Sequence, residues 1–153
     1  MITRFVLYFS LLGLSISSVA QQKLILDSLY SPSIDAHKKI YILVPEKADG
    51  PLPILYLLHG AWGDYKNWTE NTRLQEIAKD LPMIIVMPDA GNSFYVNSIS
   101  NPSQKYADYI LEDLSDYVEK KYSVDTARLG IAGLSMGGYG AFYLASLQPE
   151  RFL

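Results

Sequence analysis

The stretch Gly133-Leu134-Ser135-Met136-Gly137 governs the interpretation of the whole sequence. Apolar residues precede it and small residues follow it, so it joins a predicted strand to a predicted helix. A G-x-S-x-G pentapeptide in that setting is typical of a sharp turn that exposes a serine hydroxyl. The flanking glycines fit a strained turn in which strand and helix approach closely. The alternative interpretation is a glycine-rich turn whose only role is packing.

Five apolar or β-branched runs predict strands, at 23–30, 39–44, 54–58, 83–87 and 127–132. The third and fourth are continuously apolar, as expected for strands buried on both faces of a sheet. Helices are predicted at 72–79, with Thr72 and Gln75 in capping-box spacing, and at 138–147. The longest helix is expected to begin at Asn101-Pro102, because proline suits the first helical position.

Apolar residues at helical spacing mark the buried face of this longest helix: Tyr106, Ile110, Leu114, Tyr117 and Val118. Strands that alternate with helices predict an α/β fold, in which a mostly parallel sheet is covered on both faces. The sequence shows no repeat, no low-complexity tract and no second domain.

Composition and charge exclude several classes of function. A length of 153 residues fits one small domain. The formal net charge is −3 and both signs are interspersed, so nucleic acid is not an expected partner. The chain has no cysteine, which excludes disulfides, a thiol nucleophile and a cysteine-ligated metal.

The first twenty residues have the pattern of a secretory signal peptide. Arg4 gives a positive start, the run 5–14 is apolar, and Ser18-Val19-Ala20 offers a cleavage site before Gln21. The alternative is a membrane anchor, but the apolar run is short for a bilayer span. We therefore expect a secreted or periplasmic protein that has no membrane segment after cleavage.

Ser135 is the candidate nucleophile, and a serine hydroxyl needs a base to remove its proton. In α/β-hydrolases the oxyanion hole combines the N–H after the nucleophile with one from the loop after an earlier strand. Met136 fits the first position, and Ala61, in the loop that follows the strand 54–58, fits the second. We expect His59 to brace that loop, because the base of this fold follows the serine in the chain. His37, in an early turn, is expected at the surface.

Four further residues are candidates for contact with substrate: Trp62, Asp89, Tyr95 and Asn97. Asp89 ends a predicted strand and so lies at the carboxyl edge of the sheet, where sites of α/β proteins are found. Asp89 either binds substrate or orders the turn 88–92. Packing is the alternative role for the aromatic residues in these loops, Trp68 included.

Three segments together resemble the esterase D-like family of α/β-hydrolases: Tyr56-Leu57-Leu58-His59-Gly60-x-x-Gly63 with Trp68, Met87-Pro88-Asp89 with Tyr95-Val96-Asn97, and 131–141. The resemblance runs from about Lys23 to the end of the chain. The family includes S-formylglutathione hydrolases, feruloyl and acetylxylan esterases, tributyrin-type esterases and mycolyltransferases. It implies Ser135 as nucleophile, the amides of Ala61 and Met136 as oxyanion hole, and neither metal nor organic cofactor.

The sequence departs from this family in length. Members carry their catalytic Asp and His in a C-terminal part that residues 1–153 do not contain, so we expect 21–153 to form an α/β-hydrolase fold truncated after the elbow helix. The strand 127–132 would then have an unpaired apolar edge. We expect these residues alone to be poorly soluble and inactive.

Three functions remain open from the sequence. The first is a serine carboxylesterase that acts through an acyl-enzyme, with export favouring acyl or feruloyl esters of carbohydrates as substrates. The second is acyl transfer to a sugar or alcohol. The third is a non-catalytic truncated product or binding module. The oligomeric state is not predicted.

Overall fold

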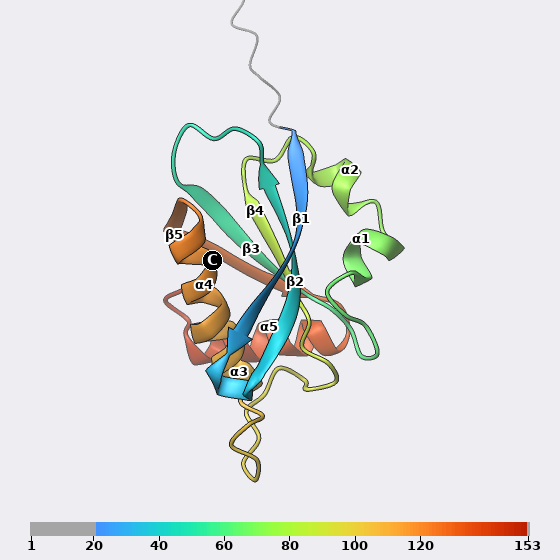
Figure 1. The fold of residues 1–153 in the computed structure, drawn as a ribbon, viewed down its shortest axis with the longest axis vertical. Helices are drawn as coiled ribbons and strands as arrows, with labels where there is room; N and C mark the ends of the chain where they lie inside the picture. Colours follow the sequence, from blue (N-terminus) through green and yellow to red (C-terminus); the bar gives the residue numbers. More distant parts are fainter. Residues whose placement is uncertain (1–20, 153) are drawn as a thin grey trace, which may run out of the picture.

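A computed structural model describes residues 21–152. A five-stranded sheet forms the centre of the molecule (Figure 1), and its strands are β1 (Gln22–Ser31), β2 (Ala36–Pro45), β3 (Leu52–Leu58), β4 (Ile84–Pro88) and β5 (Val124–Gly133). The strand order is β1-β2-β4-β3-β5. β2 is antiparallel to β1 and β4, whereas β3 is parallel to β4 and β5. Only β2 is therefore reversed, which confirms the predicted mostly parallel sheet.

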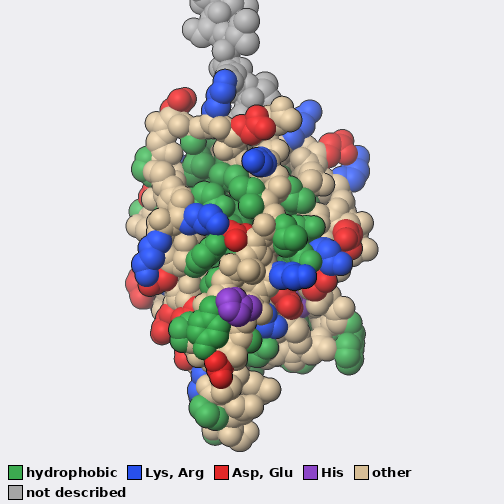
Figure 2. Space-filling model, in the orientation of Figure 1, with side chains coloured by type: hydrophobic (Ala, Val, Ile, Leu, Met, Phe, Trp, Pro, Cys, Tyr) green, Lys and Arg blue, Asp and Glu red, His purple; other side chains and the backbone are tan. Residues whose placement is uncertain are grey.

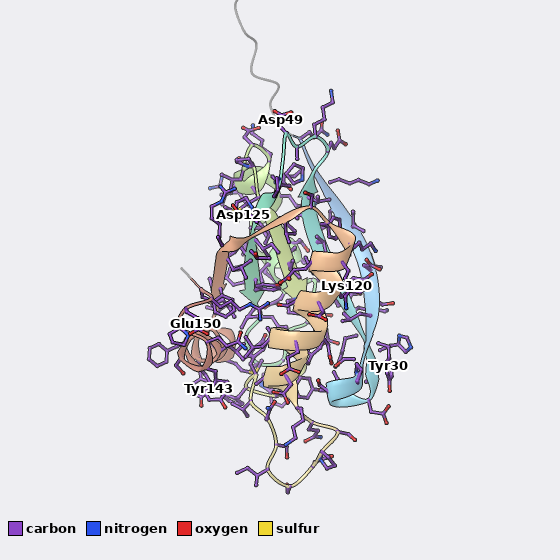
Figure 3. All side chains as sticks on the ribbon, turned by 90° about the vertical axis from the view of Figure 1, so that its left-hand side faces the viewer. Tyr30, Asp49, Lys120, Asp125, Tyr143 and Glu150 are labelled. Carbon is purple, nitrogen blue, oxygen red and sulfur yellow. The ribbon has the colours of Figure 1, made fainter. Side chains whose placement is uncertain are left out.

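Helices cover both faces of the sheet. They are α1 (Asn67–Asn71), α2 (Leu74–Ala78), α3 (Tyr106–Asp108), a π-helical segment (Tyr109–Leu114), α4 (Ser115–Lys121) and α5 (Met136–Leu147), besides a 3₁₀ turn at Pro32–Ile34. The helices α1 and α2 pack on one face, and the continuous run from α3 to α4 packs with α5 on the other. Figure 3 shows α4 lying across this second face, with Lys120 labelled.

Alternation along the strands divides the core into two parts. In β3, Tyr56 and Leu58 face the side of α4 and α5, whereas Leu57 faces α2. In β4, Val86 faces the side of α4 and α5, and Met87 faces the side of α2. Successive side chains of a strand point to opposite faces, so a continuously apolar run is what a strand between two helical layers requires.

The longest helical run begins at Tyr106, not at Asn101-Pro102 as predicted. Asn97 is responsible, because its Oδ1 accepts hydrogen bonds from the N–H groups of Ala107 and Asp108, at 2.9 and 3.2 Å. Residues 97–105 instead form a loop closed by a bridge between Asn97 and Lys105. The side-chain cap overrides the local proline signal, since it satisfies backbone donors that the start of a helix leaves free.

The helix predicted at 72–79 is observed as the shorter α2 (Leu74–Ala78), and α1 before it was not predicted. The capping box does not form as its spacing suggested. Thr72 Oγ1 accepts from the N–H of Leu74 at 3.1 Å and donates to the carbonyl of Trp68. The indole of Trp68 in turn donates to Leu58 O at 3.1 Å. Trp68 therefore fixes α1 to the end of β3.

β5 lies at an edge of the sheet, as predicted. Within residues 21–152 its outer side meets only Phe152, through a single parallel bridge at Leu129. Both signs of charge are interspersed over the face shown in Figure 2. No helix in 21–152 combines the length and apolarity that a bilayer crossing requires. The predicted signal peptide, 1–20, lies outside the described residues.

Candidate active site

Ser135 occupies a strained turn between β5 and α5. Its φ of 53° and ψ of −115° lie outside the regions that non-glycine residues favour, and its side chain is exposed. Two hydrogen bonds hold the turn: Gly137 N–H donates to Leu134 O at 2.8 Å, and Tyr139 N–H donates to Ser135 O at 3.0 Å. Strain of this kind persists where the surrounding structure enforces it, and it collects at functional sites.

The glycines of the pentapeptide are required by close backbone approaches. A Cβ on Gly133 would lie 2.9 Å from Gly137 Cα. A Cβ on Gly137 would lie 2.7 Å from His59 O and closer still to Leu58 O. The motif therefore needs glycine at these two positions, because the start of helix α5 packs directly against the ends of β5 and β3.

The loop after β3 lies against this turn. A Cβ on Gly60 would be 3.4 Å from Leu134 O and 3.7 Å from Ser135 Cβ. Gly60 O accepts hydrogen bonds from His59 Nδ1 at 2.7 Å and from Gly63 N–H at 3.1 Å. Gly60 C=O and Ala61 N–H belong to the same trans peptide and therefore point in opposite directions. The N–H of Ala61 thus points away from His59 Nδ1 and Gly63 N–H.

Two backbone donors are free beside Ser135. Met136 is the first residue of α5, where the N–H has no partner within the helix. Within residues 21–152, neither Ala61 N–H nor Met136 N–H has a hydrogen-bond acceptor. Free amides next to an exposed serine hydroxyl are the arrangement that stabilises an oxyanion during acyl transfer.

Neither histidine of the chain is placed to act as a base. His59 is buried, and its Nε2 accepts the N–H of Ala90 at 3.0 Å while its Nδ1 donates to Gly60 O. Both ring nitrogens are therefore engaged in bracing the loop. His37 is exposed on β2, which is separated from β5 by three strand spacings, or about 14 Å. In the described residues Ser135 Oγ makes no hydrogen bond.

Trp62 is the most accessible of the predicted substrate residues. It is 90% exposed, and its φ of 65° lies in the left-handed region. Its N–H donates to Asn92 Oδ1 at 2.7 Å, which ties the loop after β3 to the loop after β4. Asn92 had no signal of its own in the sequence beyond its place in a predicted turn.

Asp89 orders the turn after β4, the second of the two roles considered for it. Its Oδ1 accepts the N–H of Gly91 at 3.0 Å, and its Oδ2 lies 3.5 Å from Lys38 Nζ. A carboxylate committed to a turn and an ion pair has less capacity left for a ligand.

The structure buries Tyr95 and leaves Asn97 half-buried. Tyr95 is 0% exposed, and its hydroxyl donates to His59 O at 3.0 Å. Asn97 caps the helix at Tyr106, and its Nδ2 donates to Asp108 Oδ1 at 2.6 Å. Tyr95 has no accessible surface for a substrate, whereas contact between Asn97 and substrate stays a prediction.

The chain matches the family described as Putative esterase over residues 31–153. That match covers most of the sequence and includes the turn at Ser135 and the loop at Ala61. The chain belongs to this esterase family.

Solved structures of esterases and hydrolases share its fold. An S-formylglutathione hydrolase from Agrobacterium tumefaciens is 25% identical, with a TM-score of 0.78 over 86% of this chain and 56% of its own. The fluorophosphonate-binding serine hydrolase F of Staphylococcus aureus is 30% identical, with a TM-score of 0.77 over 86% and 55%. A ferulic acid esterase is also 30% identical, with a TM-score of 0.74 over 86% and 55%. The chain thus spans little more than half the length of these proteins.

A polar hollow of about 440 Å³ opens in the loops after β4 of this esterase chain, and it is lined by Asn92, Ser93, Val96, Ser98, Gln104 and Tyr106. Ser135 is not among the lining residues. Asn92 joins the hollow to the loop at Trp62. In residues 21–152 no three His, Cys, Asp or Glu side chains gather into a possible metal site.

Proposed function

We propose that this protein is a serine carboxylic-ester hydrolase that acts through an acyl-enzyme. The observation that carries the proposal is Ser135, exposed at a strained turn beside the backbone N–H groups of Ala61 and Met136, which have no acceptor in the described part of the chain. Membership of the esterase family supports it. So does a fold shared with a fluorophosphonate-binding serine hydrolase.

In the proposed reaction Ser135 Oγ attacks the ester carbonyl and gives its proton to a base. The carbonyl oxygen becomes an oxyanion and accepts hydrogen bonds from Ala61 and Met136. Each such donor contributes about 3 kcal/mol of transition-state stabilisation. The intermediate collapses, the alcohol leaves with the proton, and water then releases the acid from Ser135.

We propose that the base and its orienting carboxylate come from a part of the polypeptide that residues 1–153 do not include. Two observations support this. Both histidines are committed elsewhere, one buried in a brace and the other on a distant strand. The related structures are also much longer than the chain.

For the substrate we propose acyl or feruloyl esters of carbohydrates. The hollow after β4 offers amide and hydroxyl groups from Asn92, Gln104 and Tyr106, which suit a neutral sugar. A protein of similar fold is a ferulic acid esterase. The predicted signal peptide agrees with an ester met outside the cell, so we propose a secreted or periplasmic enzyme whose mature form begins at Gln21. N-terminal sequencing of the mature protein tests that start.

Covalent labelling tests the proposed chemistry. The longest natural form of the protein is treated with a fluorophosphonate probe, and the labelled peptide is identified by mass spectrometry. We expect label on Ser135 and none in Ser135→Ala. Ser146→Ala is the matched control, since Ser146 lies exposed on the same helix and donates to Tyr143 O.

Failure to label would support the non-catalytic alternative. Where Ser135 does label, product analysis with a sugar acceptor separates hydrolysis from acyl transfer: free acid shows hydrolysis, and a new ester shows transfer.

A further inference from the structure

Tyr95 connects three parts of the site without being accessible to a ligand. It is 0% exposed and lies in the loop after β4. Both Phe94 and Tyr95 have positive φ angles, of 54° and 59°. Two consecutive non-glycine residues in this region are rare and persist only where packing enforces them. The loop is thus held in an unfavourable conformation that places the Tyr95 ring in the interior.

The hydroxyl of Tyr95 holds the oxyanion loop. It donates to His59 O at 3.0 Å, on the peptide that leads into Gly60. The imidazole of His59, whose ring lies 5.9 Å from that of Tyr95, donates to the next carbonyl, Gly60 O. Together these bonds fix the peptide between His59 and Gly60 and the peptide between Gly60 and Ala61, which carries Ala61 N–H.

The ring of Tyr95 supports the nucleophile helix. A Cβ on Gly140 would lie 2.7 Å from Tyr95 Cγ, so the first turns of α5 rest on this ring. The carbonyl that the hydroxyl binds also lies against Gly137, on the same helix. One side chain therefore contacts the elements that carry both proposed oxyanion donors.

We propose that Tyr95 is a positioning residue that sets the distance between Ala61 N–H and Met136 N–H. This inference rests on the proposed esterase function and adds a residue to it. Tyr95 does not touch substrate, because its side chain has no accessible surface. Its hydroxyl acts on the loop and its ring acts on the helix, so loss of either misplaces one donor relative to the other.

Two variants separate the two actions, in the longest natural form of the protein. Tyr95→Phe removes the hydroxyl and keeps the ring. Gly140→Ala keeps every polar group and displaces the ring. Tyr109→Phe is the matched control, since Tyr109 is equally buried and its hydroxyl has no hydrogen-bond partner among residues 21–152.

We expect Tyr95→Phe to lower kcat for p-nitrophenyl acetate about 10- to 100-fold with KM unchanged, since displaced oxyanion donors weaken only the transition state. The rate of fluorophosphonate labelling at Ser135 should fall with it. Gly140→Ala should act in the same direction, and Tyr109→Phe should keep the wild-type rate.

A wild-type kcat in Tyr95→Phe would overturn the inference. A rise in KM alone would also overturn it, because that result identifies a substrate contact. Equal losses of kcat in Tyr95→Phe and Tyr109→Phe would show a general packing effect instead. Wild-type protein that neither labels nor hydrolyses would reject the proposed function itself, which distinguishes the two failures.

Discussion

Ser135 shows how few residues determine the geometry of this site. Its positive φ is enforced by backbone contacts on both sides: Gly133 packs on Gly137, and Gly137 packs on the carbonyls that end β3. At these two positions even a methyl group has no room. The serine between them has side-chain space because it points outward.

A methyl group at Gly137 should therefore disrupt the fold. We expect Gly137→Ala to lower the free energy of unfolding by about 3 kcal/mol or more, because its neighbours are backbone atoms that cannot move aside. Chemical denaturation followed by circular dichroism measures this. Gly50→Ala is the control, since nothing lies within 4 Å of its added Cβ. Equal denaturation midpoints for the two variants would contradict the steric explanation.

Among the elements, the long helical run depends on a cap from outside it. Asn97→Ala removes the acceptor for two backbone donors and should lower the free energy of unfolding by about 1 kcal/mol. Asn101→Ala, which removes only an exposed turn contact to Ser103, should have an effect within about 0.5 kcal/mol. Denaturation midpoints test both. An increase in KM with unchanged stability would instead support Asn97 as a substrate contact.

β1 and α4 are joined by a pH-sensitive pair. Burial raises the pKa of the Asp27 carboxyl, but hydrogen bonds from Lys121, Tyr117 and Ser28 N–H outweigh it and leave the pKa below its usual range. The hydrogen bond to Asp27 raises the pKa of Lys121. A lowered carboxyl pKa contributes stability above the unfolded value of about 3.9, and that stability is lost as the pH falls through the folded value.

Asp27→Asn should therefore be less stable than wild type at pH 7, with a difference that shrinks below about pH 4. We expect about 1 kcal/mol or less, since Lys121 is 43% exposed and water screens the pair. Melting temperatures across pH measure the difference. Asp116→Asn, which breaks an exposed pair with Lys120, should match wild type throughout. A constant difference for Asp27→Asn down to pH 2 would contradict the assignment.

At the scale of the whole molecule, the described residues leave apolar surface uncovered. The outer edge of β5 carries one bridge, and Leu134, Phe142 and Leu147 project from α5 and the turn before it. Figure 3 shows Tyr143 on the same helix. Unpaired strand edges beside exposed apolar side chains promote association.

We predict that residues 21–153 expressed alone aggregate and do not hydrolyse p-nitrophenyl acetate, because they lack both a base and a cover for β5. Size-exclusion chromatography and an esterase assay measure these two properties. Ser135→Ala serves as the control for background hydrolysis. A soluble monomer with Ser135-dependent turnover would refute the prediction.

Much of this fold could be predicted from local pattern. All five strands were expected near their observed positions, because apolar runs between turn residues are a short-range signal. The start of the long helix was not, since Pro102 favours a local beginning and the deciding cap comes from Asn97. Tyr95 was expected to contact substrate. Local pattern could not reveal its burial, because its ring packs against Gly140, which is remote in the sequence.

The sequence by itself determined the elbow, the approximate positions of the five strands, and the candidate nucleophile. These depend on glycine's conformational freedom and on apolar periodicity, both of which act over a few residues. Only the tertiary structure decided that Asn92 links two loops and that Tyr95 lies beneath the oxyanion loop. Each of these roles depends on hydrogen bonds and packing between loops that follow different strands, and a pattern along one segment carries no record of which loop will lie beside it.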